Sequence, residues 1–273
     1  MSKILIGVFD TEAAAFEGLT ALRELHRDGD ISLYAYSVIT KSASGWVTVP
    51  ETVDRGPAGT LVGLVAGGLV GLLGGPVGAA VGASIGGLSG LAFDMVGAGI
   101  SSDFAAEVMH TLTPGKSAVV ADVDETWVTP VDTRLTALGG VVFRRYPGDV
   151  IDDELVRETQ LASDDLEHLR TELRDATGAA RANVKDAIER QQAKLKSLAA
   201  RVDEALEKQR HEFEARLAIL RAQRDHALED QRQQVQARID GLKASYEARR
   251  GQLEGARQRA KQSAEAAREA LKR

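Results

Sequence analysis

Three short stretches of the sequence carry residue types suited to binding phosphate, a dinucleotide or a metal ion. Gly115-Lys116-Ser117 resembles the end of a phosphate-binding loop, but such a loop needs a glycine where this chain has His110. The segment before it also has the pattern of a helix, whereas a phosphate-binding loop follows a strand. We therefore interpret it as a helix-to-strand turn. Gly97-Ala98-Gly99 lacks the third glycine of a dinucleotide-binding fingerprint.

The third stretch, Asp122, Asp124 and Glu125, suggests a weak cation site because residues 122 and 124 share one strand face. A charged strand end is the interpretation that we favour. The five histidines provide no ready metal pair, since no two of them lie three or four positions apart: His26, His110, His168, His211 and His226. No serine lies in a nucleophile elbow. The sequence therefore predicts no catalytic residue, no metal site and no cofactor, and it favours a protein that is not an enzyme.

Composition narrows the function classes further. Cysteine is absent, which excludes disulfides and thiolate metal sites. Residues 1–150 contain 9 Lys and Arg against 16 Asp and Glu, and residues 151–273 contain 25 against 24. An acidic first half and a balanced second half argue against nucleic acid as a partner. The apolar run after Met1 is too short for a secretory signal, so we expect the N-terminus in the cytosol.

The first 150 residues have the element order of an α+β domain. Strands are predicted over 3–9, 31–40, 46–52 and 117–123, with one helix capped by Asp10 or Thr11 and a second beginning near Ser101 or Ser102. The order β-α-β-β-α-β is typical of a ferredoxin-like fold. A further helix over 131–138 and a strand over 141–146 would extend the sheet. Trp46 and Trp127 are expected at strand ends, in the core or at its rim.

A second feature interrupts this domain. No charged residue occurs between Arg55 and Asp94, a run of 38 positions. Within this run, glycines recur at every fourth position on either side of the Gly74-Gly75-Pro76 break: Gly59, Gly63, Gly67, Gly71 and Gly75, then Gly78, Gly82, Gly86 and Gly90. Residues four apart share one helix face, so the sequence predicts an inserted helical hairpin over 56–96 whose limbs pack through a glycine zipper.

Three environments are conceivable for this hairpin. A flexible linker is the least favoured, because linkers are polar and have no four-residue period. A lipid bilayer suits the lack of charge, although each limb of 17 residues would be about 25 Å long and slightly short of the hydrocarbon core. The interior of an oligomer, in which hairpins of several copies pack together, is the alternative to the bilayer.

The C-terminal region, 151–273, reads as a long helix, because it lacks proline and is rich in Ala, Glu, Arg, Gln, Leu and Lys. Thr177-Gly178 is a predicted bend or hairpin turn. Beyond it, apolar residues keep an eleven-residue repeat, which is typical of a nearly straight coiled coil. The predicted stripe comprises Val184, Leu195, Leu198, Val202, Leu206, Phe213, Leu217, Leu220, Leu228, Val235, Ile239, Leu242 and Tyr246.

A coiled coil with sister subunits and an amphipathic helix lying on lipid would both use this stripe. Only about three positions in eleven are apolar, and Gln209, Arg224 and Gln231 vacate some of them. A lipid-bound helix needs a broader apolar face, so the pattern favours the coiled coil.

Residues 3–145 resemble the DUF1269 family of uncharacterised bacterial proteins. The matching pieces are Ile4 to Asp10, the uncharged Gly59–Gly90 stretch, Asp103-Phe104 and Leu112 to Ala118. Members of this family are usually labelled membrane proteins. The resemblance implies no activity and no catalytic residues, and it does not extend over the long C-terminal helix.

Together these patterns favour a non-enzymatic, self-assembling scaffold that associates with a membrane through the glycine-zipper hairpin and oligomerises through the C-terminal helix. We expect it at the cytoplasmic side of the bacterial inner membrane, with itself and the lipid bilayer as partners and with no small-molecule substrate identified. Stress protection is one role that such a scaffold would suit. The alternatives are a soluble, cytoplasmic homo-oligomer such as a cage, tube or filament with buried hairpins, and a sensor domain that binds a small ligand or ion.

Overall fold

The computed structural model describes residues 2–53, 60–73, 102–146 and 150–272. These residues form two compact units, each described below by itself. The first unit contains Met1–Val150 and His211–Lys243, and the second contains Ile151–Arg210 and Ala244–Arg273. The protein is an α+β protein with a five-stranded antiparallel sheet and a long C-terminal helical region.

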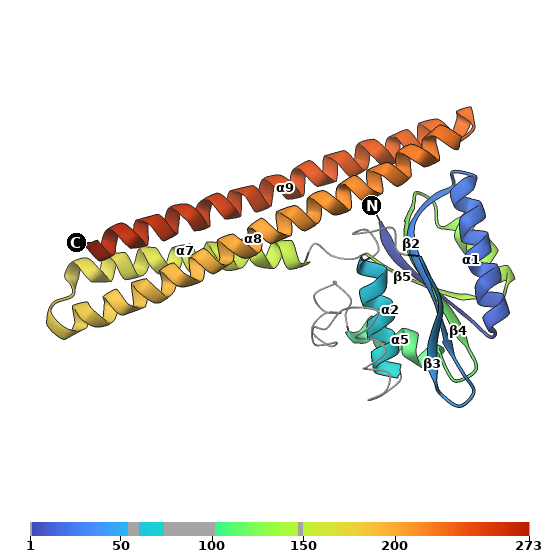
Figure 1. Ribbon diagram of the computed structural model, residues 1–273, viewed down its shortest axis with the longest axis horizontal. Coiled ribbons are helices and arrows are strands. Elements are labelled where there is room, and N and C mark those ends of the chain that lie inside the picture. Colours follow the sequence, from blue (N-terminus) through green and yellow to red (C-terminus); the bar gives the residue numbers. More distant parts are fainter. Residues whose placement is uncertain (1, 54–59, 74–101, 147–149, 273) are drawn as a thin grey trace. The chain divides into compact units, whose positions relative to one another are not determined.

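The first unit is built on a sheet with helices on both faces (Figure 1). Its elements are β1 (Lys3–Phe9), α1 (Glu12–Arg27), β2 (Ile31–Lys41), β3 (Val47–Val53), α2 (Thr60–Leu73), α5 (Ser102–Thr111), β4 (Ser117–Glu125), α6 (Thr129–Ala137) and β5 (Val141–Arg145). Helices α1 and α6 share a core with one face of the sheet, whereas α2 and α5 share a core with the other face. Alternation of side chains along each strand feeds both cores.

The strand order β3-β2-β4-β1-β5 corrects the ferredoxin-like prediction. In a ferredoxin-like sheet, the strand that follows β2 directly would lie between β1 and β2. Here β4 takes that place and β3 lies at the edge. Pro50 explains the difference, because proline cannot donate a ladder hydrogen bond and is confined to edge strands and bulges. The pairing of β3 with β2 indeed shifts by one residue between Val38 and Thr40, opposite Pro50.

A side-chain cap and two glycines position α1 on the sheet. The Thr11 hydroxyl accepts a hydrogen bond from the Ala14 amide at 3.1 Å and so caps α1. Under this helix, the Phe9 ring lies 2.5 Å from the place where a Cβ on Gly18 would stand and 2.6 Å from the corresponding place on Gly140. Only glycine fits at these two positions, so β1, α1 and β5 close together around one aromatic ring.

Helix α2 is the described part of the predicted glycine hairpin. Its buried apolar residues belong to the core on one face of the sheet: Val62, Val65, Ala66, Leu69 and Val70. Of the predicted zipper, Gly63, Gly67 and Gly71 lie in α2, and Gly67 is buried. The others, Gly59, Gly75, Gly78, Gly82, Gly86 and Gly90, lie outside the described residues. Among the described helices, none has the length and apolar character that crossing a bilayer requires.

The second unit is an antiparallel three-helix bundle. It consists of α7 (Val150–Asp175) from residue 151 onward, the first part of α8 (Gly178–His226) and the last part of α9 (Glu229–Lys272). Gln191 of α8 donates to the carbonyl of Ala162 in α7 at 2.7 Å, and Gln192 donates to that of Ala264 in α9 at 3.0 Å. The predicted stripe residues Val184, Leu195, Leu198 and Val202 pack inside this bundle, and Leu206 packs partly buried against it.

The long helix predicted beyond residue 178 is interrupted at Ala227-Leu228. Leu228, expected in the apolar stripe, is therefore in a turn and 73% exposed. The charges around the break explain it: α8 ends with Arg224 and His226, and α9 begins with Glu229 and Asp230. Basic residues stabilise a helix C-terminus and acidic residues a helix N-terminus, so this order of charges favours two helices over one.

Candidate functional site

The most strongly built contact surface in the first unit joins the sheet to residues 211–243, which we call the helical tip. The tip contains the end of α8, the turn and the start of α9. Its apolar part surrounds Tyr34 of β2 and consists of Leu217, Ile219, Leu220, Val235 and Ile239, with Phe213 and Leu242 partly buried beside them. Six of these residues belong to the predicted stripe, which is thus satisfied here within one chain.

Tyr34 reaches the tip because of a bulge in β2. The pairing of β2 with β4 shifts by one residue between Leu33 and Ala35, so Tyr34 is the extra residue. Bulges redirect a side chain out of the regular alternation. The Tyr34 side chain is 2% exposed, and the Arg216 guanidinium of the tip lies 5.0 Å from its ring centroid. Burial raises the pKa of the Tyr34 hydroxyl, which keeps it neutral.

A buried ion pair lies next to this ring. Arg216 Nη2 lies 2.8 Å from Oδ2 of Asp122, a β4 residue with no exposed surface. Arg216 also pairs with Glu212 one helical turn away at 2.7 Å and donates to the hydroxyl of Ser2. Burial raises the pKa of Asp122 to about 6, although the positive charge of Arg216 acts in the opposite direction. The pair therefore joins the tip to the middle of the sheet.

Two further side chains of the tip bind the backbone at the start of β2. Gln223 donates to the carbonyls of His26 and Ile31, both at 2.6 Å, and its oxygen accepts from the Ser32 hydroxyl at 2.6 Å. Arg238 donates to the carbonyls of Gly29 at 2.9 Å and Asp30 at 2.6 Å. Burial lowers the pKa of Arg238. Because the carbonyls of the α1–β2 turn point in fixed directions, Gln223 and Arg238 can bind them only when the tip lies in one position.

The polar contact is strong but incomplete. Asp122 Oδ1, Arg216 Nε and Arg238 Nε are buried without a hydrogen-bond partner among the described residues. A buried polar atom left unpaired costs free energy, so this surface favours one arrangement of the tip without maximising its stability. The chemistry is that of recognition: guanidinium and amide groups hold carbonyls and a carboxylate.

The weak cation site considered as the less favoured interpretation of Asp122, Asp124 and Glu125 does not agree with these neighbours. Asp122 faces Arg216, and Glu125 pairs with Lys3 at 3.3 Å and with Arg144 at 2.6 Å. The carboxylates are thus compensated by cations of the chain itself, as expected for a charged strand end. Across the part of the chain that is described, no group of three or more His, Asp or Glu is arranged to hold a metal ion.

The remaining residues singled out in the sequence lie away from the tip contact or in local turns. Gly115, at φ +93°, lies in the turn from α5 to β4, where Lys116 pairs with Asp10 at 3.0 Å. His26 accepts a hydrogen bond from the Leu33 amide at 3.2 Å, so it belongs to the local structure of the α1–β2 turn. Of the remaining stripe residues, Tyr246 is half-buried.

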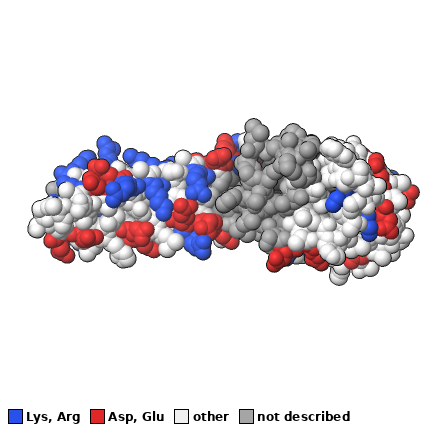
Figure 2. Space-filling view, turned by 90° about the horizontal axis from the view of Figure 1, so that it is seen from below, with Lys and Arg blue, Asp and Glu red and all other residues white. Residues whose placement is uncertain are grey.

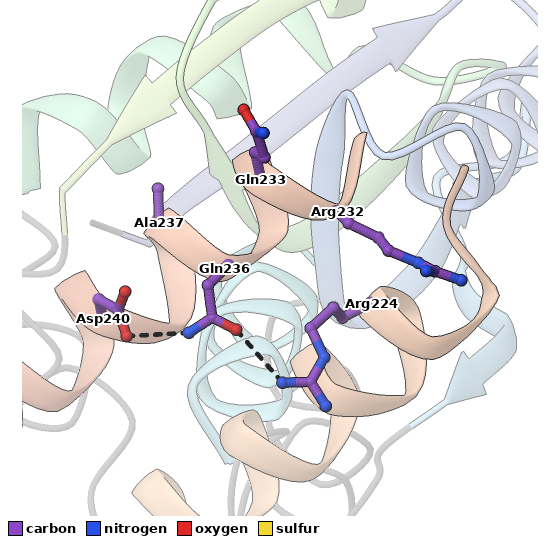
Figure 3. A pocket seen from close by; sticks show the side chains of 6 residues that line it. All are labelled: Arg224, Arg232, Gln233, Gln236, Ala237 and Asp240. Atoms are coloured by element: carbon purple, nitrogen blue, oxygen red, sulfur yellow. Dashed lines mark hydrogen bonds between the residues drawn. The ribbon is translucent and has the colours of Figure 1, made fainter. Parts of the chain in front are cut away.

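Two hollows lie on the described surface of the first unit. An open one of about 460 Å³ lies on the tip between Arg224, Arg232, Gln233, Gln236, Ala237 and Asp240 (Figure 3). Its polar groups partly satisfy one another, since Arg224 donates to Gln236 and Gln236 donates to Asp240. A narrower one of about 230 Å³ is lined by Arg23, His26, Leu33, Tyr34 and Tyr36. Arg23 there already bonds the Tyr36 hydroxyl and Glu51.

The polar residues of the tip contact were not predicted from the sequence, although most of its apolar residues belong to the predicted stripe. Arg216 and Arg238 lie one position before Leu217 and Ile239 of the stripe, and they are two eleven-residue repeats apart. The repeat thus places both on one edge of the apolar stripe. Nothing in the repeat distinguishes an arginine that faces solvent from one that faces a buried carboxylate.

The comparisons with known proteins give one match. No curated protein and no solved structure matches the chain. The family DUF1269, described as a protein of unknown function, matches residues 60–174, from α2 to the last turn of α7. The resemblance inferred from the sequence for residues 3–145 is therefore confirmed over 60–145, which contains most of the uncharged run and the strands β4 and β5. The match also covers most of α7, so the expectation that the resemblance ends before the C-terminal helices was wrong for this helix.

Proposed function

We propose that this chain is a non-catalytic scaffold protein, which associates with a membrane and with copies of itself through its glycine-rich hairpin. Helix α2 carries this proposal. It has no charged residue and is apolar on every side, because its positions are filled by Leu, Val, Ala and Gly apart from Thr60. A helix that is apolar on every side must be buried from water on every side, in a protein core or in a membrane.

The sheet covers one side of α2. Val62, Leu69 and Val70 are almost fully buried in the core that α2 shares with the strands. The uncharged sequence continues from Leu73 to Phe93, and its glycines keep the four-residue period. Acyl chains, or the same segment of another copy, are the partners that such a sequence suits.

The packing of the C-terminal helices is a reason to assign self-association to the hairpin and not to these helices. Most of their apolar stripe is buried within the chain, in the three-helix bundle and around Tyr34. The exposed surface of the bundle carries charges of both signs (Figure 2). Such a surface suits an arm that stays in water. A hairpin that enters and leaves a membrane on one side would keep both units on the same side, which we propose to be the cytoplasmic side.

A second function has one specific observation in its favour. The packing of α2 on the sheet suits a soluble homo-oligomer, in which hairpins are buried among protein surfaces and never enter lipid. Each α2 limb of 14 residues would be about 21 Å long, short of the hydrocarbon core of about 30 Å. This oligomer would purify without detergent as one large, uniform particle.

Fractionation distinguishes the two functions. Under the membrane proposal, the full-length chain stays in a carbonate-washed membrane pellet. Gly82→Arg, which places a charge in the uncharged run, should release it. Gly251→Arg is the matched control, because that position has open space around a new side chain on a charged helix. Release of the unmodified chain into the soluble fraction would remove the membrane proposal and leave the oligomer to be tested by its particle size.

A further inference from the structure

The two ends of the sheet differ. At one end, Ile31 of β2 pairs with Glu125 of β4, and the helical tip binds near this end through Ser32 and Asp122. At the other end, Thr40 pairs with Ser117. We call this second end, formed by residues 41–46 and 113–116, the turn end.

The turn end is tightly bonded. The Lys41 amide donates to the Lys116 carbonyl at 2.9 Å, and the Gly115 amide donates to the Lys41 carbonyl at 2.7 Å. Trp46 is held in the same way: its amide donates to the Ser42 hydroxyl at 2.9 Å and its carbonyl accepts from the Ser42 amide at 2.8 Å. The closed turn therefore presents the Trp46 side chain on a rigid base.

Trp46 is unusually exposed for a residue of its size, at 61%. A tryptophan exposed to water gains no free energy from burial of its ring. At a bilayer interface the ring contacts acyl chains while its N–H bonds to the headgroups. Val47, the neighbour of Trp46, is buried in the core that the sheet shares with α2, so the chain anchors the turn end directly beside Trp46.

The charges at this end do not favour an electrostatic partner. Lys116 is neutralised by Asp10 at 3.0 Å, and Lys41 Nζ donates to the Leu112 carbonyl at 3.5 Å. On the described surface of the first unit, Figure 2 shows separate basic and acidic side chains among uncharged ones, with no large patch of one sign. A surface whose two lysines already have partners and that carries an exposed tryptophan suits lipid better than nucleic acid or an acidic partner.

We propose that the turn end, with Trp46 at its surface, rests against the interface of a phospholipid bilayer. This inference depends on the membrane association proposed above and assigns the face that makes it. Because the contact is apolar, binding should not require anionic lipid and should change little with salt.

Tryptophan fluorescence tests the proposal, since Trp46 and Trp127 are the two tryptophans of the chain. Trp127 is 70% exposed and follows β4 at the opposite end of the sheet, so it is a matched control. Trp127→Phe leaves Trp46 as the reporter, and Trp46→Phe leaves Trp127. Both full-length variants are mixed with phosphatidylcholine vesicles, with and without phosphatidylglycerol, and vesicle binding is measured by flotation.

We expect a blue shift of Trp46 emission and a severalfold loss of its quenching by iodide, with no change at Trp127. Flotation without any change at Trp46, or with equal changes at both tryptophans, would overturn the assignment of the turn end and leave membrane association standing. Absence of flotation in both variants and in the unmodified chain would overturn both proposals.

Discussion

Two helical segments pack on the same face of the sheet by different means. Helix α2 covers the part with Val120, and its buried contacts are aliphatic. The helical tip covers the part with Asp122, which shares that face because it lies two residues further along β4. There the contacts include a buried ion pair and hydrogen bonds to backbone carbonyls.

This difference separates the strength with which a helix packs on the sheet from the place on the sheet at which it packs. Aliphatic packing stabilises in proportion to the area buried, and it tolerates small shifts of a helix along the sheet. Buried polar groups lose hydration, so they stabilise little beyond an apolar replacement, but they penalise every arrangement in which they are unpaired. We infer that α2 contributes mainly to the stability of the core, whereas Arg216, Gln223 and Arg238 determine where the tip binds.

Removing one partner of the ion pair should have the largest effect. Asp122→Ala removes the fully buried carboxylate and leaves the buried Arg216 guanidinium with Glu212 as its remaining ion-pair partner. At pH 7 we expect a loss of about 3–5 kcal/mol in the free energy of unfolding, with faster amide exchange in residues 211–243. Urea denaturation and hydrogen exchange measure these effects. The control is Asp122→Leu combined with Arg216→Met, which should be close to the unmodified chain. A double variant as unstable as the single one would contradict this account of the pair.

Truncation of the aliphatic contact comes next. Leu69→Ala opens a cavity between α2 and the sheet and should cost about 2–5 kcal/mol in urea denaturation. Because no titrating group is involved, the loss should be the same at pH 5 and pH 7. A loss confined to one pH would show that α2 and the tip are not independent. Hydrogen exchange of the tip should stay unchanged in this variant.

The pH dependence belongs to the tip contact. Burial raises the pKa of Asp122 from 3.8 to about 6, so the folded state binds more protons than the unfolded state between these values. The contribution of this group to the free energy of unfolding should therefore fall as the pH rises from about 4 to 6. Asp122→Asn should remove that part of the slope. An unchanged slope in Asp122→Asn would mean that other groups cause the pH dependence.

A smaller effect is expected for the amide that binds the α1–β2 turn. Gln223→Ala removes the donor to the carbonyls of His26 and Ile31 and should cost about 1–3 kcal/mol, with faster exchange of the tip amides. Gln233→Ala, an exposed position on the same tip, is the matched control and should stay within about 0.5 kcal/mol of the unmodified chain. Equal effects of the two changes would argue against recognition by Gln223.

The smallest effect is expected at Leu228. The eleven-residue repeat assigns Leu228 and Leu217 the same role, but Leu228 is exposed in the turn and Leu217 is buried around Tyr34. Leu228→Ser should change the free energy of unfolding by less than about 0.5 kcal/mol, whereas Leu217→Ser should cost several times more. Thermal or urea denaturation of the two variants gives the comparison, and equal losses would indicate an unbroken helix through residue 228.

The sequence by itself determined the local elements. Apolar alternation and helical spacing predicted the five strands and the helices of the first unit, the Thr11 cap and the turn at Gly115. The charge order of Arg224 and His226 before Glu229 and Asp230 also contained the break between α8 and α9. These signals are local, because each depends on residues within a few positions of one another.

Only the tertiary structure decided which faces meet. The apolar stripe of residues 184–246 indicated a partner helix but did not identify it, and much of it packs against the same chain. Arg216 and Asp122 are 94 positions apart, and their pairing depends on the bulge at Tyr34 and on the insertion of β4 between β1 and β2. The physical reason is that periodicity specifies the face that must be buried, whereas the free energy of burial is similar for many partners. Polar groups that fit only one of them make the choice.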